Sequence, residues 1–166
     1  MLVEIFYQFD EFCKLFQKSL ISDKRKGRKN KLKLSEILTI MVMYHYSGYK
    51  TFKDYYIKHV MREWFKDFPN LTSYARFVEL KTRSIIPLIH WIKIVGNGTC
   101  TGISFIDSFT LKACHTKRQY SHKVLKAVSG KGKTSLGWFY GLKLHLVINH
   151  VGEIIDFCIT PGNYSR

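Results

Sequence analysis

Carboxylates are scarce in this 166-residue chain, which carries 12 Asp and Glu against 27 Lys and Arg, a formal charge of +15. Residues 108–152 lack them altogether, although the same stretch contains eight Lys or Arg. So large a positive excess does not suit a basic partner, whereas clustered Lys and Arg neutralise phosphates and release the counterions around them. We therefore expect an acidic partner, with nucleic acid ahead of an anionic membrane surface.

Closely spaced cysteines and long apolar runs are also missing. The four cysteines form no Cys-x-x-Cys pair, which argues against a zinc knuckle and a redox motif. No apolar run approaches the ~18 residues of a spanning helix, because the longest candidate, residues 85–94, is interrupted by Pro87, His90 and Lys93. With 46% hydrophobic residues the chain can still bury a core. These features predict a globular cytoplasmic protein with reduced thiols and no membrane partner.

The first hundred residues have helical periodicity. Apolar residues recur at steps of three and four over residues 4–20, which predicts an amphipathic helix. Ser35, Thr51 and Ser73 each precede another apolar stretch and could cap three further helices through their hydroxyls. Pro87 should kink or divide the last of these. The pattern predicts an N-terminal helical bundle.

Two parts of this helical region are candidates for DNA contact. Residues 24–33 carry seven Lys or Arg and should form an exposed basic arm, with these predicted contacts: Lys24, Arg25, Lys26, Arg28, Lys29 and Lys31. The helix after Ser73 follows another helix and a turn at Pro69-Asn70, which is the order of a helix-turn-helix, and it could present Arg76 to DNA. Ordinary packing of a helical bundle explains the same order.

After residue 98 the pattern changes to that of strands. Residues 103–107 have strand composition, and residues 142–149 and 153–160 alternate with a period of two around a turn at 150–152. The chain as a whole is therefore predicted to be α+β.

Asp107 ends the apolar run 103–107 and is the last carboxylate before Glu153. A lone acid at a strand end, facing a long basic stretch, suits a carboxylate that holds a metal beside a polyphosphate substrate. One carboxylate cannot build a two-ion site, and an acid in this position is also a common solvent-facing residue or turn former.

The basic stretch after Asp107 contains two further candidates. Residues 117–123 and 129–135 predict a phosphate-contacting loop or an ordinary solvated loop, through Lys117, Arg118, Lys123, Lys131 and Lys133. The loop ends in a Gly-Lys-Thr sequence but lacks the first glycine of a P-loop. Lys143 and His145 share the less apolar face of their predicted strand, where they could approach a phosphate or be plain polar positions.

Three groups of segments together resemble bacterial DDE transposases of the insertion-sequence 982 family. They are residues 34–40 with 47–56, residues 73–80, and residues 106–108 with 141–146 and 160–163. The resemblance implies a helical DNA-binding region over residues 1–98 and the front part of an RNase H-like catalytic domain over residues 99–166. It also implies that Asp107 is the first of three acids that bind two Mg²⁺ ions for phosphodiester cleavage and strand transfer.

The resemblance further implies partners and a limit on activity. The partners would be insertion-sequence ends and either a second copy of the chain or an intact transposase. The protein would be cytoplasmic and associated with the nucleoid. The second and third acids have no counterpart in residues 108–166, so we expect a truncated transposase that is inactive alone. The alternative is a non-enzymatic DNA-binding module that competes with or partners an intact transposase, and a basic protein that associates with RNA or anionic lipid is a third interpretation.

Overall fold

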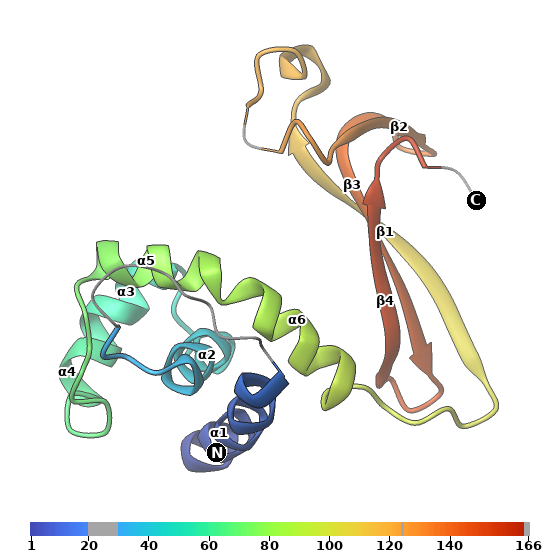
Figure 1. The fold of residues 1–166 in the computed structure, drawn as a ribbon. Coiled ribbons are helices and arrows are strands. Elements are labelled where there is room, and N and C mark those ends of the chain that lie inside the picture. Colours follow the sequence, from blue (N-terminus) through green and yellow to red (C-terminus); the bar gives the residue numbers. More distant parts are fainter. Residues whose placement is uncertain (20–29, 124, 165–166) are drawn as a thin grey trace. The chain divides into compact units, whose positions relative to one another are not determined.

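The computed structural model describes residues 1–19, 30–123 and 125–164, and it divides into two compact units, Met1–Ile92 and Lys93–Arg166 (Figure 1). Each unit is described by itself. Helices dominate the first unit and an antiparallel sheet the second, so the predicted α+β class is confirmed. Of the predicted basic arm, residues 24–29 lie outside the described residues. Within the described ranges, no helix combines the length and the apolar character needed to cross a bilayer.

The predicted first helix is α1 (Leu2–Ser19), and it packs against α2 (Leu34–Met43). Phe9 and Phe12 from α1 are buried with Leu38 from α2 in one apolar cluster. This arrangement buries the apolar face that the spacing of three and four residues predicted for α1.

The start of α2 differs from the prediction that Ser35 caps it. The cap position is Lys33, two residues earlier, and the Glu36 carboxylate accepts the backbone N–H of Lys33 at 2.6 Å. Ser35 lies inside the helix, where its hydroxyl donates to Asp10 Oδ1 on α1 at 3.4 Å. The glutamate three residues after the cap position therefore fixes the start of the helix by binding the N–H of the cap residue, and no serine hydroxyl caps it.

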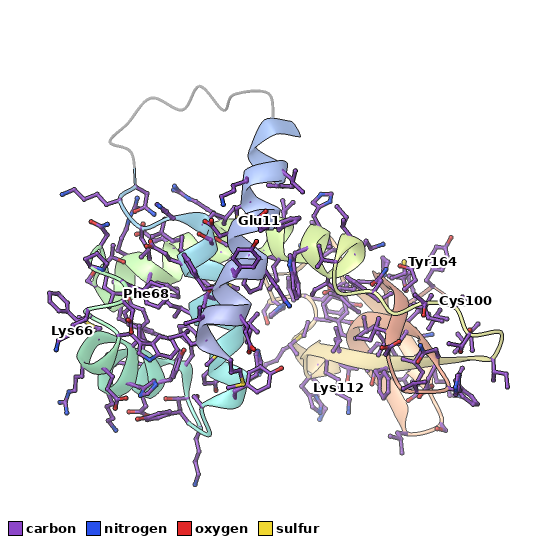
Figure 2. The ribbon with its side chains drawn as sticks, turned by 90° about the horizontal axis from the view of Figure 1, so that it is seen from below. Glu11, Lys66, Phe68, Cys100, Lys112 and Tyr164 are labelled. Carbon is purple, nitrogen blue, oxygen red and sulfur yellow. The ribbon has the colours of Figure 1, made fainter. Side chains whose placement is uncertain are left out.

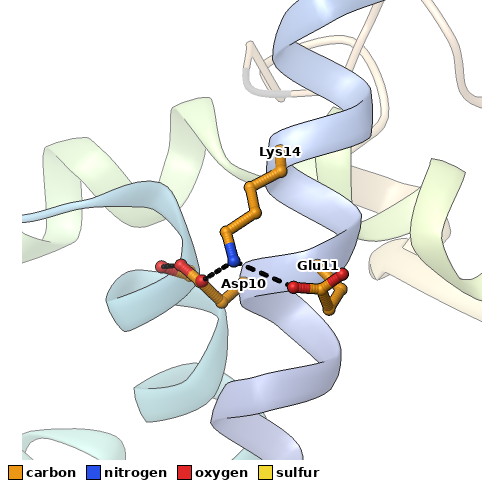
Figure 3. A network of polar contacts seen from close by, with 4 residues as sticks. Asp10, Glu11 and Lys14 are labelled. Atoms are coloured by element: carbon orange, nitrogen blue, oxygen red, sulfur yellow. Dashed lines mark hydrogen bonds and ion pairs between the residues drawn. The ribbon is translucent and has the colours of Figure 1, made fainter.

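A small ionic network on α1 supports the contact with α2 (Figure 3). Lys14 Nζ lies 3.0 Å from Asp10 Oδ2 and 2.8 Å from Glu11 Oε1. The hydrogen bond from Lys14 holds the pKa of the Asp10 carboxyl below its usual range. Because these side chains are largely in solvent, their contribution to stability is small, and it fades only as pH falls through the lowered pKa of Asp10.

The third predicted helix is interrupted by a π-helical stretch, giving α3 (Phe52–Tyr55), η2 (Tyr56–Val60) and α4 (Met61–Glu63). Thr51 caps it as predicted, because its hydroxyl oxygen accepts from the Asp54 N–H at 3.1 Å. A short 3-10 helix, η1 (Tyr44–Tyr46), joins α2 to this segment through Gly48, whose positive φ of 71° suits glycine.

The fourth predicted helix divides into α5 (Tyr74–Arg83) and α6 (Ile85–Ile94). Ser73 caps α5 as predicted, accepting from the Arg76 N–H at 3.4 Å. The division falls at Ser84, three residues before Pro87. Pro87 cannot donate to the carbonyl of Arg83 four residues earlier, but it is tolerated in the first turn of a new helix.

The second unit is a four-stranded antiparallel sheet in which β3 (Gly137–Asn149) is central. It pairs on one side with β1 (Ser104–Cys114) and also with β2 (Gly130–Thr134) and β4 (Ile154–Pro161). The predicted hairpin of residues 142–160 is therefore confirmed, with Gly152 at a φ of 90° in its turn. A 3-10 turn, η3 (Thr116–Arg118), follows β1.

Two strand predictions were wrong. The first strand does not end at Asp107 but continues to Cys114, because residues 108–114 alternate polar and apolar side chains along β3. Residues 130–134 of the predicted loop form strand β2. Its Gly-Lys alternation carries no apolar signal, so periodicity could not reveal it.

Close backbone packing explains the glycines of β2 and of the Pro161-Gly162-Asn163 turn. A Cβ on Gly132 would lie 2.1 Å from the Gly162 carbonyl oxygen, and one on Gly162 would lie 2.5 Å from that of Gly130. Both glycines also pack on the ring of Phe139, which is only 3% exposed. Glycine at these positions lets the turn after β4 lie directly on β2.

Candidate functional site

Asp107 is the fourth residue of β1 and lies opposite Leu146 on β3. Because residues directly opposite in an antiparallel pair share a face, the Asp107 carboxylate belongs to the apolar face of the sheet. Phe105 and Phe109, two residues to either side, share that face and are 56% and 50% exposed. Asp107 is itself exposed, and its Oδ1 accepts the Ser108 N–H at 2.7 Å. Its second carboxylate oxygen has no partner among the described residues.

The other two carboxylates of this unit are occupied elsewhere. Glu153 Oε2 accepts from Asn149 Nδ2 at 2.7 Å, which fixes the turn after β3. Asp156 lies opposite Val147, on the other face from Asp107, and sits 3.4 Å from Lys93 Nζ. The Phe157 backbone N–H, with help from Lys93, holds the pKa of Asp156 below its usual range.

A Mg²⁺ site therefore does not assemble from the described residues alone. Among them, no group of three or more His, Cys, Asp or Glu could hold a metal ion. Asp107 supplies one carboxylate, whereas Mg²⁺ demands near-octahedral oxygen coordination and binds weakly to a single protein ligand. The residues present do not fit a complete two-ion centre.

Lys143 and His145 lie together on the polar face of the sheet. The Lys143 ammonium donates to the Tyr164 carbonyl oxygen at 3.1 Å, and His145 Nε2 lies 2.9 Å from Thr160 Oγ1. Both border a cavity of about 180 Å³, together with Tyr164, which is labelled in Figure 2, and residues 106–108 of β1. Asp107 is among the residues that line this cavity, although the strand register places it on the opposite face from Lys143 and His145.

The predicted phosphate-contacting loop divides into two parts. Lys117 and Arg118 belong to η3, which is capped by His115 Nδ1 accepting from the Lys117 N–H at 3.3 Å, and Lys123 is exposed nearby. Lys131 and Lys133 instead lie on strand β2. The basic residues are thus held by two different elements of one unit.

In the helical unit, the structure brings Lys31 and Arg76 to one hollow of about 470 Å³. Its other lining residues are Asn30, Pro69, Asn70, Leu71 and Thr72. The hollow therefore lies between the end of the predicted basic arm and the first turn of α5, the helix predicted to face DNA. The sequence did not identify Asn70 and Thr72 as neighbours of Lys31, because only the fold brings the turn before α5 next to that residue.

The described end of the basic arm departs from the prediction in one respect. Leu32 is only 3% exposed and joins the core of the helical unit, whereas Lys31 beside it is exposed. One apolar residue within a basic run is therefore enough to anchor it. This anchor holds Lys31 at the hollow.

Sequence reasoning also missed Trp138, the second residue of β3. Its indole is 59% exposed, and the ammonium groups of Lys131 and Lys133 lie 4.8 and 5.8 Å from its ring centroid. A tryptophan within an acid-free basic stretch was the available signal.

Residues 97–166 match a family model described as "Transposase DDE domain". The matched segment contains Asp107, all four strands and the predicted phosphate-contacting lysines and arginine of residues 117–143. The chain matches no curated protein and no solved structure at a significant level. The match supports a DDE transposase family for this part of the chain.

Proposed function

We propose that this chain is a transposase of an insertion sequence, of the DDE class and similar to the insertion-sequence 982 family. The match of residues 97–166 to a transposase DDE domain is the observation that carries the proposal. An antiparallel arrangement of β1, β3 and β4 is compatible with the first strands of an RNase H-like domain. The formal charge of +15 supports DNA as the partner.

In this proposal the two parts of the chain have different tasks. Residues 1–98 bind the ends of the element, with α5 as the second helix of a helix-turn-helix and with the basic segment 24–33 on the DNA backbone. The hollow that contains Lys31 and Arg76 lies where these two elements meet, which suits a phosphate contact that sets register. In residues 99–166, Asp107 supplies the first acidic ligand for Mg²⁺.

We further propose that residues 1–166 assayed by themselves do not cleave DNA. Asp107 is one carboxylate, and Glu153 and Asp156 are held by Asn149 and Lys93. Further acids would have to come from outside residues 1–166, for example from an intact transposase in a mixed assembly. Magnesium bound there would activate the attacking hydroxyl.

The test is a strand-cleavage assay on a labelled duplex carrying the end of the element, in Mg²⁺ or Mn²⁺. We expect residues 1–166 to bind this duplex and leave both strands intact. Cleavage by the wild type that disappears in Asp107→Asn would contradict inactivity while supporting the transposase class. The matched control is Asp156→Asn, which removes an acid on the opposite face of the same sheet.

The alternative function is a non-enzymatic DNA-binding module that regulates an intact transposase. The engagement of Glu153 and Asp156 in structural contacts favours it. Adding residues 1–166 to an intact transposase separates the two functions. If residues 1–166 act as a competitor, the wild type and Asp107→Asn should lower cleavage by the intact transposase equally. If they contribute Asp107 to a mixed assembly, Asp107→Asn should lose the effect that the wild type has on cleavage.

A further inference from the structure

The hairpin of β2 and β3 has two unlike faces. Strand alternation puts Phe139 on the inner face, where it packs against Gly132 and Gly162. Trp138 points the other way and lies directly opposite Lys133, and Lys131 is on the same face, opposite Tyr140. Phe139 thus anchors the inner face, whereas on the outer face only Tyr140 is buried and Trp138 lies exposed beside two lysines.

Among the described residues, no aromatic or apolar side chain covers the Trp138 ring on the outer face. Trp138 is 59% exposed, and Leu136 at the tip of the hairpin is 94% exposed. Neither Lys131 nor Lys133 forms an ion pair within the described part of the chain, and the sequence offers no acid between residues 108 and 152. The two ammonium groups rest over the indole instead, an attraction that is weak at an exposed site and is readily exchanged for a phosphate.

We propose that the outer face of this hairpin, formed by Lys131, Lys133 and Trp138, binds an unpaired base of single-stranded nucleic acid. The base stacks on the indole, and the lysines turn from the ring to the flanking phosphates. An exposed aromatic ring beside basic residues is the arrangement that binds single strands without sequence preference, because every base has a π-face. A duplex does not fit this ring, since its bases are already stacked on one another.

The rigidity of the hairpin supports this assignment. The ring is carried by paired strands, and the buried Phe139 with the glycine contacts fixes the strand that bears it. A fixed ring loses little conformational freedom when a base stacks on it. The inference goes beyond the proposed transposase function because the site needs neither Asp107 nor a metal ion.

The test compares residues 1–166 and their variants for binding to labelled oligo(dT) and to a duplex of equal length. We expect Trp138→Leu to weaken oligo(dT) binding roughly 5- to 150-fold, the effect of losing one stacked base. Duplex affinity should change less than about twofold, and Trp138→Phe should recover part of the loss. Phe109→Leu, which shortens another exposed ring on the same sheet, is the matched control and should bind like wild type.

A second variant separates stacking from charge. Lys131→Gln with Lys133→Gln should lower the salt slope of oligo(dT) binding by about 1.4, or ~0.7 for each phosphate that is no longer neutralised. Equal losses on duplex and single strand in Trp138→Leu, or no loss on either, would overturn the proposal. So would binding to vesicles of phosphatidylserine that depends on Trp138, in a protein that does not bind oligo(dT).

Discussion

Replacement of Phe77 by alanine should destabilise the helical unit by about 3–5 kcal/mol, the usual effect of removing a fully buried phenylalanine side chain. Phe77 on α5 is 0% exposed, and its ring lies 4.6 Å from that of Tyr56 and 5.7 Å from that of Phe52. The cavity would open where η2 and α3 pack on α5. Because small domains have only about 5–15 kcal/mol of stability, much of the unit should unfold.

Urea unfolding followed by circular dichroism at 222 nm measures this loss, since the helices lie in the first unit. Val78→Ala is the matched control, because Val78 is the next residue on α5 and is 37% exposed. Its effect should stay within about 0.5 kcal/mol. A Phe77→Ala variant within about 1 kcal/mol of wild type would mean that α5 does not pack on the aromatic core as described.

Core contacts of α5 also bear on the proposed DNA binding, because this helix carries Arg76, one of the predicted contacts. Tyr56 donates its hydroxyl to the Thr72 carbonyl at 2.7 Å, and Tyr55 donates to the Ile40 carbonyl at 3.2 Å. Burial raises the pKa of both phenols. The Tyr56 bond holds the turn before α5, and with it the hollow that contains Lys31 and Arg76, whereas the Tyr55 bond ties α3 to α2.

Duplex affinity should fall by about 10³-fold or more between 50 and 200 mM salt, which is the second large effect. If the seven Lys and Arg of residues 24–33 each neutralise one phosphate, the slope of log affinity against log salt is about −6. Fluorescence anisotropy with a labelled duplex over a salt series measures it.

Neutralising part of the basic segment tests the source of that slope. A triple variant with Lys24, Arg25 and Lys26 changed to Gln should make the slope shallower by about 2.7, or ~0.9 for each phosphate that is no longer neutralised. Lys66→Gln, which removes an exposed charge elsewhere in the helical unit, should leave it unchanged. A flat salt response in the wild type would exclude phosphate contact as the basis of binding.

The helix starts show what sequence could and could not predict. Thr51 and Ser73 cap their helices as predicted, because each hydroxyl oxygen accepts a hydrogen bond from the backbone N–H three residues later. Ser35 did not, since its hydroxyl is used between helices and Glu36 takes its place. Local chemistry is visible in sequence, whereas a contact between residues 10 and 35 is not.

The sheet and the candidate sites follow the same rule. The β3–β4 hairpin was predictable because its strands are adjacent and alternate clearly. Strand β2 was not predictable, because its glycines and lysines lack an apolar pattern. Their roles depend on contacts with Gly162 and Trp138, which only the fold shows. The meeting of Lys31 with Arg76 at one hollow, and the placement of Asp107 on the opposite face of the sheet from Lys143 and His145, likewise required the fold.

The proposed transposase function requires that this chain recognise the ends of an insertion sequence. The most direct measurement is the affinity of residues 1–166 for a duplex carrying the terminal repeat that flanks its gene, compared with a scrambled duplex of equal length and composition. We expect at least ~10-fold tighter binding to the repeat at one salt concentration, the discrimination that a single good base contact provides. Equal affinity for the two duplexes would contradict the claim.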